Sequence, residues 1–107
     1  MGDDRRRAVR DLEEVRGADW SRATWSEPDD GGDLVLVRQS LTSHGDQEVV
    51  WRVPVQRVGE LCGLAGAPAS DVDGLLGWAE EEPERVEALV DALERMDPPV
   101  VDGISLG

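Results

Sequence analysis

Two β-branched, apolar stretches separated by a turn constrain the fold of this chain more than any other feature. Residues 34–37 and 49–53 consist mainly of valine and leucine, and residues 43–46, Ser-His-Gly-Asp, have the composition of a hairpin turn. Segments of this kind favour extended backbone and pair when a short turn joins them. The sequence therefore predicts an antiparallel β-hairpin.

The turn also predicts the register of this hairpin. A loop of residues 44–45 or of residues 43–46 places Thr42 opposite Gln47. Because side chains alternate along a strand, the apolar residues then share one face: Leu34, Leu36, Val49, Trp51, Val53 and Val55. Arg38 is expected at the end of this apolar face. Because proline has no N–H to donate, Pro54 predicts that the second strand of the hairpin lies at the sheet edge.

A helix and a short strand are predicted before the hairpin. The helix covers about residues 3–16 and ends at Gly17, on the spacing of Ala8, Val9, Leu12 and Val15. Its arginines at positions 5–7 are flanked by acids, which favours a solvated ion-pair face. The strand covers residues 20–25 and is followed by the turn-rich segment 27–33.

Three helices are predicted after the hairpin. The first follows the spacing of Val58, Leu61, Cys62 and Ala65 and ends at Gly66. In the second, Ser70 is the expected N-cap, and the apolar residues are Val72, Leu75, Leu76 and Ala79. The third begins near Pro83 and carries the stripe Val86, Leu89, Val90, Leu93 and Met96.

These elements predict a single α+β domain over residues 1–107. An N-terminal helix is expected to precede a three-stranded antiparallel β-meander, followed by three C-terminal helices packed on one sheet face. Residues 98–107 are expected to form a frayed or extended tail.

The charge of the chain excludes several classes of partner. With 24 Asp and Glu against 11 basic residues, all of them arginine, the formal net charge is -13. Direct nucleic-acid binding and anionic membranes are not expected, since both require a cationic surface. The absence of lysine and asparagine indicates a high-GC bacterial genome, and the lack of a long apolar segment leads us to expect a cytoplasmic protein.

No residue pattern points to catalysis, a cofactor or a metal. His44 is expected to be an exposed turn residue, and Cys62 a buried thiol on the apolar side of its helix. The acids of segment 27–33 do not have the spacing of a calcium-binding loop, which leaves only weak divalent-ion binding open for this turn. We therefore expect no enzymatic activity.

The negative charge is concentrated in the second half of the chain. Residues 1–57 hold 12 acids and 9 arginines, whereas residues 58–107 hold 12 acids and 2 arginines. The acids of the last predicted helix and of the turn before it form the candidate partner-binding surface, to which we add a tryptophan as an interface anchor: Glu80, Glu81, Glu82, Glu84, Glu87, Asp91, Glu94 and Trp25.

The function hypothesis that follows is a small, non-enzymatic binding protein that docks an acidic helical face on a basic partner protein. Inhibitors, antitoxins and immunity proteins would use such a surface. Two alternatives stay open. One is a peptide-binding accessory domain that uses a sheet edge. The other is a homo-oligomeric structural subunit or homodimer in contact through the outer sheet face, at Val35, Val37 and Val50.

Overall fold

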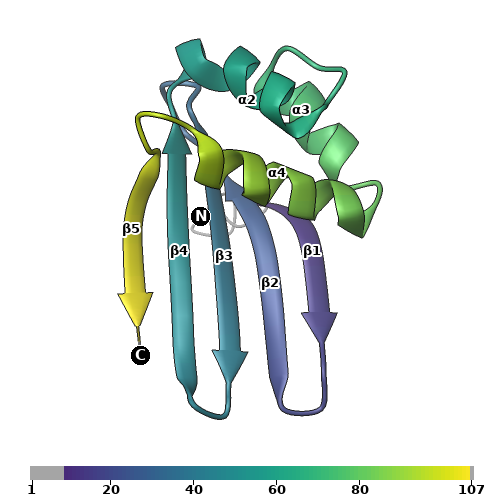
Figure 1. Cartoon of the computed structure of the whole chain (residues 1–107), viewed down its shortest axis with the longest axis vertical. Coiled ribbons are helices and arrows are strands. Elements are labelled where there is room, and N and C mark those ends of the chain that lie inside the picture. The colour runs from purple at the N-terminus through teal and green to yellow at the C-terminus, as the bar shows by residue number, and fades with distance from the viewer. Residues whose placement is uncertain (1–8, 107) are drawn as a thin grey trace, which may run out of the picture.

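The computed structural model describes residues 9–106. Five strands form one antiparallel sheet in the order β1-β2-β3-β4-β5 (Figure 1). They are β1 (Arg10–Arg16), β2 (Trp20–Glu27), β3 (Leu34–Thr42), β4 (Gly45–Val53) and β5 (Val101–Leu106). The helices all lie between β4 and β5 in the sequence: η1 (Val55–Arg57), α2 (Val58–Ala65), α3 (Val72–Ala79) and α4 (Pro83–Arg95). The fold is therefore of the α+β class.

The predicted N-terminal helix is wrong where the structure tests it, because residues 10–16 form strand β1. Arginine, glutamate and leucine favour the helix by only a few tenths of a kcal/mol per residue (about 0.5 or less). Pairing with β2 instead provides hydrogen bonds for the backbone of this segment and buries Leu12 in the core. Gly17, the expected helix end, instead forms a tight turn in which its N–H donates to the carbonyl of Trp20 at 2.8 Å. Residues 3–8 of that predicted helix, with the arginines at 5–7, lie outside the described residues.

The predicted three-stranded sheet is also wrong, because β1 and β5 extend it at both sides. Residues 101–106, expected to be a tail, pair with β4. The hairpin strand β4 is consequently an interior strand, and Pro54 does not mark a sheet edge. Proline is tolerated there because β4 ends at Val53, so no ladder hydrogen bond is lost.

The hairpin forms as predicted, but its register differs by two residues. Thr42 lies opposite Gly45, which leaves a two-residue turn of Ser43 and His44, and Leu36 lies opposite Trp51. A shift of two preserves the alternation of side chains, so the predicted apolar face is confirmed for residues 34–53. Val55 is the exception, since it has left the sheet and lies exposed in η1.

The three predicted helices are confirmed as α2, α3 and α4, with one different cap. Asp71, and not Ser70, caps α3, since its side chain accepts a hydrogen bond from the N–H of Gly74 at 2.8 Å. Helix α2 ends at Gly66, which has a left-handed backbone with φ of 76°. Pro83 occupies the first turn of α4, as expected.

Helix α4 crosses the strands on one face of the sheet, near one end, and α2 and α3 lie beside α4 at that end (Figure 1). The prediction that the three helices pack on one sheet face is therefore correct for α4, whereas α2 and α3 pack mainly against α4. The core fills the space beneath them and includes Leu36 and Trp51 from the sheet and Leu89 and Leu93 from α4. None of the helices within residues 9–106 is long and apolar enough to cross a bilayer. Beyond α4 the same sheet face turns polar, and the candidate site lies at this boundary.

Candidate functional site

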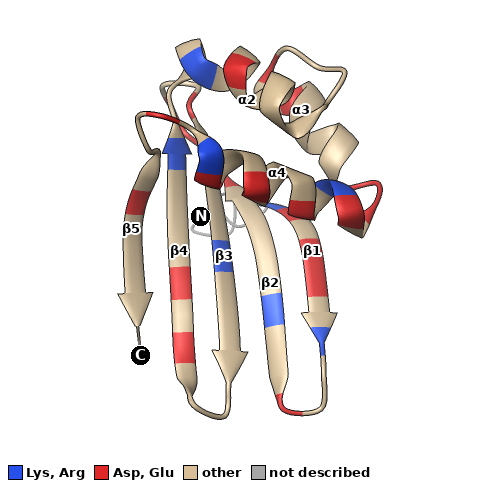
Figure 2. Cartoon of the chain, in the orientation of Figure 1, with Lys and Arg blue, Asp and Glu red and all other residues tan. Residues whose placement is uncertain are grey.

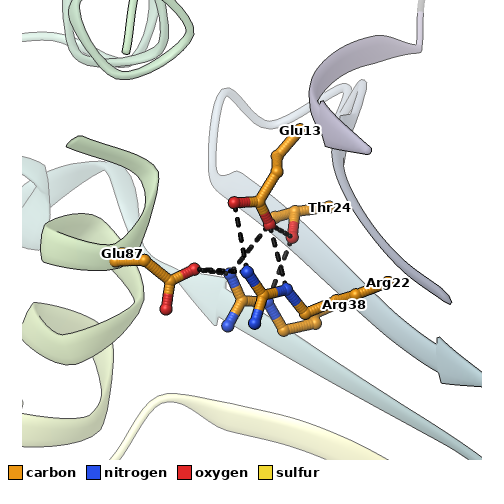
Figure 3. A network of polar contacts seen from close by, with 5 residues as sticks. All are labelled: Glu13, Arg22, Thr24, Arg38 and Glu87. Carbon is orange, nitrogen blue, oxygen red and sulfur yellow. Dashed lines mark hydrogen bonds and ion pairs between the residues drawn. The ribbon is translucent and has the colours of Figure 1, made fainter. Parts of the chain in front are cut away.

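A network of charged side chains joins α4 to the polar part of the sheet (Figure 3). Glu13 of β1 accepts hydrogen bonds from Arg22 at 3.1 and 3.3 Å and pairs with Arg38 at 3.4 Å. Arg38 also donates to Thr24 Oγ1 at 3.0 Å. From α4, Glu87 Oε2 lies 2.6 Å from Arg38 Nη2 and 3.1 Å from Arg22 Nη2. Two carboxylates thus neutralise two arginines.

The two carboxylates of this network have different surroundings. The side chain of Glu13 is 5% exposed, whereas that of Glu87 is 48% exposed. Burying an arginine is costly unless an anion lies against it, so Glu13 is what allows Arg38 to lie beneath α4. Glu87 then ties the middle of α4 to the sheet and faces an adjoining groove.

This groove has a volume of about 560 Å³ and runs between α4 and the strands β3, β4 and β5. We call it the α4 groove. Its α4 side presents three acids at helical spacing, Glu87, Asp91 and Glu94, together with Val90. The sheet side supplies the rest of the lining: Arg38, Gln47, Val49, Trp51, Val101 and Ile104. The groove therefore has one acidic wall and a largely apolar floor.

Trp51 lines the α4 groove and also carries a buried, unpaired polar atom. The residue is only 3% exposed, and its indole Nε1 has no hydrogen-bond partner within residues 9–106. A buried donor without an acceptor costs about 1–3 kcal/mol. The sequence correctly placed Trp51 on the core face, but this orphaned donor depends on packing and has no signal in the sequence.

The structure divides the predicted acidic surface into two parts. Glu87, Asp91 and Glu94 line the α4 groove. The other four acids lie at the opposite end of α4 and in the turn before it, and most of them are paired with nearby arginines: Glu80, Glu81, Glu82 and Glu84. These seven acids do not form one continuous face.

Glu80 links the end of α3 to strand β1. Arg10 of β1 donates to its two carboxylate oxygens at 3.0 and 2.7 Å. These hydrogen bonds hold the pKa of Glu80 below its ordinary value. Glu81 and Glu82 both pair with Arg85, which also lies 5.3 Å from the ring of Trp78.

Trp25 lies apart from the acidic helix. It is opposite Val37 in the sheet, so it projects from the face that the helices do not cover. Its indole N–H donates to Glu27 at 3.0 Å, and the residue is half-buried. The structure thus does not bring Trp25 together with Glu87, Asp91 and Glu94.

The remaining candidate residues lie outside the α4 groove. His44 is exposed in the turn, and Cys62 is buried with its pKa raised by that burial, both as predicted. In the acidic turn, Asp29 pairs with Arg52 at 2.7 Å and accepts hydrogen bonds from the N–H groups of Asp33 and Gly31, and these contacts lower the pKa of Asp29. Within residues 9–106, no three His, Cys, Asp or Glu side chains form a group that could hold a metal ion.

Every arginine of the described chain is engaged by the protein's own carboxylates. Residues 9–106 contain eight arginines and 22 acids. The eight all form ion pairs: Arg10, Arg16, Arg22, Arg38, Arg52, Arg57, Arg85 and Arg95. Carboxylates therefore account for the excess charge. Figure 2 shows acidic residues along α4 and in the turn before it, and also on β1, β4 and β5.

No protein family, curated protein or solved structure matches this chain. The functional argument consequently depends on the α4 groove itself. The sequence predicted its acidic wall. It did not predict the wall formed by β5, because residues 101–106 are too short and too mixed to be recognised as a strand without their partner β4.

Proposed function

We propose that the protein is a non-enzymatic binding protein whose α4 groove receives a basic segment of a partner protein. The observation that carries this proposal is the composition of the groove. Glu87, Asp91 and Glu94 repeat at one helical turn along its wall, while Val49 and Ile104 line the other side. Arginine and lysine suit such a site, since their charged ends pair with acids and their alkyl stems cover apolar surface.

The arginine pairing supports the same partner chemistry. A phosphate or an acidic peptide would need an uncommitted cation. Among residues 9–106 the one cation that lines the groove is Arg38, which already pairs with Glu13 and Glu87. Of the groove acids, Glu87 pairs with Arg38 and Arg22, and Asp91 pairs with Arg95 at 3.1 Å. Glu94 has no ion-pair partner within residues 9–106, so its charge is available to a ligand. The surrounding carboxylates would also attract a basic partner over longer distances.

The floor of the groove adds apolar contact to the proposed site. Trp51 lies there with Val49, Val101 and Ile104, and its Nε1 is buried. A bound segment would then be held by charge at the α4 wall and by apolar contact at the floor. Inhibitors, antitoxins and immunity proteins are the classes of protein that would use such a surface.

A homodimer through the outer sheet face has less support. Val35 and Val37, the residues expected to form that contact, are buried already, and Val50 is half-buried. They leave little apolar surface for a second chain, so we do not carry this alternative forward.

The proposal is tested with a synthetic peptide of alternating arginine and valine, by isothermal titration calorimetry at low salt. Glu94→Arg should weaken binding about five- to tenfold, since it replaces an attraction of about 1 kcal/mol by a repulsion. Glu84→Arg is the matched control, because Glu84 is also an α4 glutamate without an ion-pair partner within residues 9–106 but does not line the groove.

Three results would contradict the proposal. The first is an absence of binding by the arginine–valine peptide. The second is an equal loss of affinity in the Glu94→Arg and Glu84→Arg variants. The third is an affinity that does not change between about 0.05 and 0.3 M NaCl, because exposed charge pairs weaken over this range.

A further inference from the structure

β5 is an edge strand with an unpaired outer side. In the sheet order it pairs with β4 alone, so its second row of N–H and C=O groups has no strand partner within residues 9–106. All six of its residues are exposed, with Ile104 at 59% and Leu106 at 77%. Such an edge is a template for another strand.

The other edge of the sheet is protected against strand addition. Five of the seven residues of β1 are charged, and the strand has a bulge between Asp11 and Glu13. β5 also has a bulge, at its first residues, but residues 103–106 are regular and carry no charge. Sheets prevent unwanted pairing with charges and bulges, so this contrast indicates that β5 is kept open for a partner.

We propose that an extended segment of the basic partner adds to β5 as a further strand. This inference rests on the proposed function and names its binding mode. Ile104 belongs both to β5 and to the lining of the α4 groove. An arginine or lysine on the helix side of an added strand therefore extends across Ile104 toward Glu94.

Charge distinguishes this partner from a second copy of the chain. Two copies joined at β5 would bring together two chains with a net charge of -13 each, with an acidic groove wall beside each copy's edge strand. A basic segment in the same position neutralises that wall. The edge thus fits an extended basic peptide and disfavours self-pairing.

The experiment uses the arginine–valine peptide and two N-methylated forms of it. Alternate amides of a strand point to opposite edges, so methylating all arginine amides blocks one edge and methylating all valine amides blocks the other. We expect one methylated peptide to bind about tenfold more weakly than the other, because only one edge of the peptide faces β5. Equal affinities of the two forms would overturn strand addition.

Amide hydrogen exchange provides the second measurement. On binding of the unmethylated peptide, amides within residues 103–106 should exchange more slowly, because those facing away from β4 gain an acceptor. Protection confined to α4 would overturn strand addition and leave the proposed function standing. An absence of binding by the unmethylated peptide would contradict both.

A matched pair of variants separates the edge from general charge effects. Ile104→Lys places a repelling charge on β5 and should weaken peptide binding about tenfold. Leu41→Lys makes the same change at an exposed strand residue that does not line the groove, and should change affinity less than about twofold. Equal effects of both would overturn the inference. So would a dimer in light scattering of the free protein that Ile104→Lys abolishes.

Discussion

The carboxylate of Glu13 is almost fully buried, and two arginines, Arg22 and Arg38, depend on it. Replacing Glu13 by glutamine removes the anion while both cations remain. We expect Glu13→Gln to lower the free energy of unfolding by about 2–3 kcal/mol, measured by urea denaturation. Glu87→Gln should cost less than about 1 kcal/mol, because Glu87 is half-exposed and water replaces it. Equal losses in the two variants would show that burial does not set the difference.

Glu80 should make stability depend on pH. Its pKa lies below the ordinary value because Arg10 donates two hydrogen bonds to it. A lowered pKa in the folded state means that the stabilisation is complete above the ordinary pKa of about 4.3 and is lost as the pH falls through the folded value. Glu80→Gln should therefore destabilise by about 0.5 kcal/mol at neutral pH, and wild type and variant should converge in acid.

The control for this variant is Glu84→Gln, which also removes one negative charge but from an acid without an ion-pair partner within residues 9–106. At neutral pH it should destabilise less than Glu80→Gln, because no ion pair is lost. If the Glu80→Gln difference were as large in acid as at neutral pH, the Arg10 pair would not be its source.

At the scale of the element, a glycine inside α2 and the glycine that caps its C-terminus have opposite roles. Gly66 ends the helix with a φ of 76°, a conformation that costs other residues about 1 kcal/mol. Gly63 lies inside the same helix, and a Cβ added there meets no atom within 4 Å. We expect Gly66→Ala to destabilise by about 1 kcal/mol and Gly63→Ala to stabilise by about 0.5–1 kcal/mol. Thermal unfolding of the two variants measures both, and a shift in the same direction would contradict the assignment.

The elements that the sequence predicted correctly are those with a strong local pattern. Helix α4 has five apolar residues at helical spacing and a proline in its first turn, and the β3–β4 hairpin has alternating apolar residues around a turn. The strands β1 and β5 lack such a pattern. β1 is mostly charged, and β5 mixes exposed apolar residues with Asp102 and Gly103. Their extended backbone is stabilised by pairing with β2 and β4, which local propensity does not encode.

At the scale of the whole molecule, the excess of negative charge opposes folding. The described residues hold 22 acids and eight arginines, and all eight arginines are paired, so the remaining carboxylates repel one another. Salt screens this repulsion. We expect the free energy of unfolding in urea to rise by on the order of 1 kcal/mol between about 0.02 and 0.3 M NaCl. A fall in stability would mean that the ion pairs outweigh the repulsion, and KCl at equal ionic strength should reproduce the NaCl result.

Local sequence was sufficient for the α+β class, the apolar face of the hairpin, the helices α2–α4 and the acidic residues of α4, because each depends on contacts between residues close in the chain. The site required the folded chain. Arg22 and Arg38 pair with Glu13 and Glu87, and these four residues come from three strands and a helix. β5 follows the three helices in the sequence and returns to pair with β4. Because of these long-range contacts, the predicted acidic helix α4 forms one wall of a groove, and the edge strand β5 lies along the same groove.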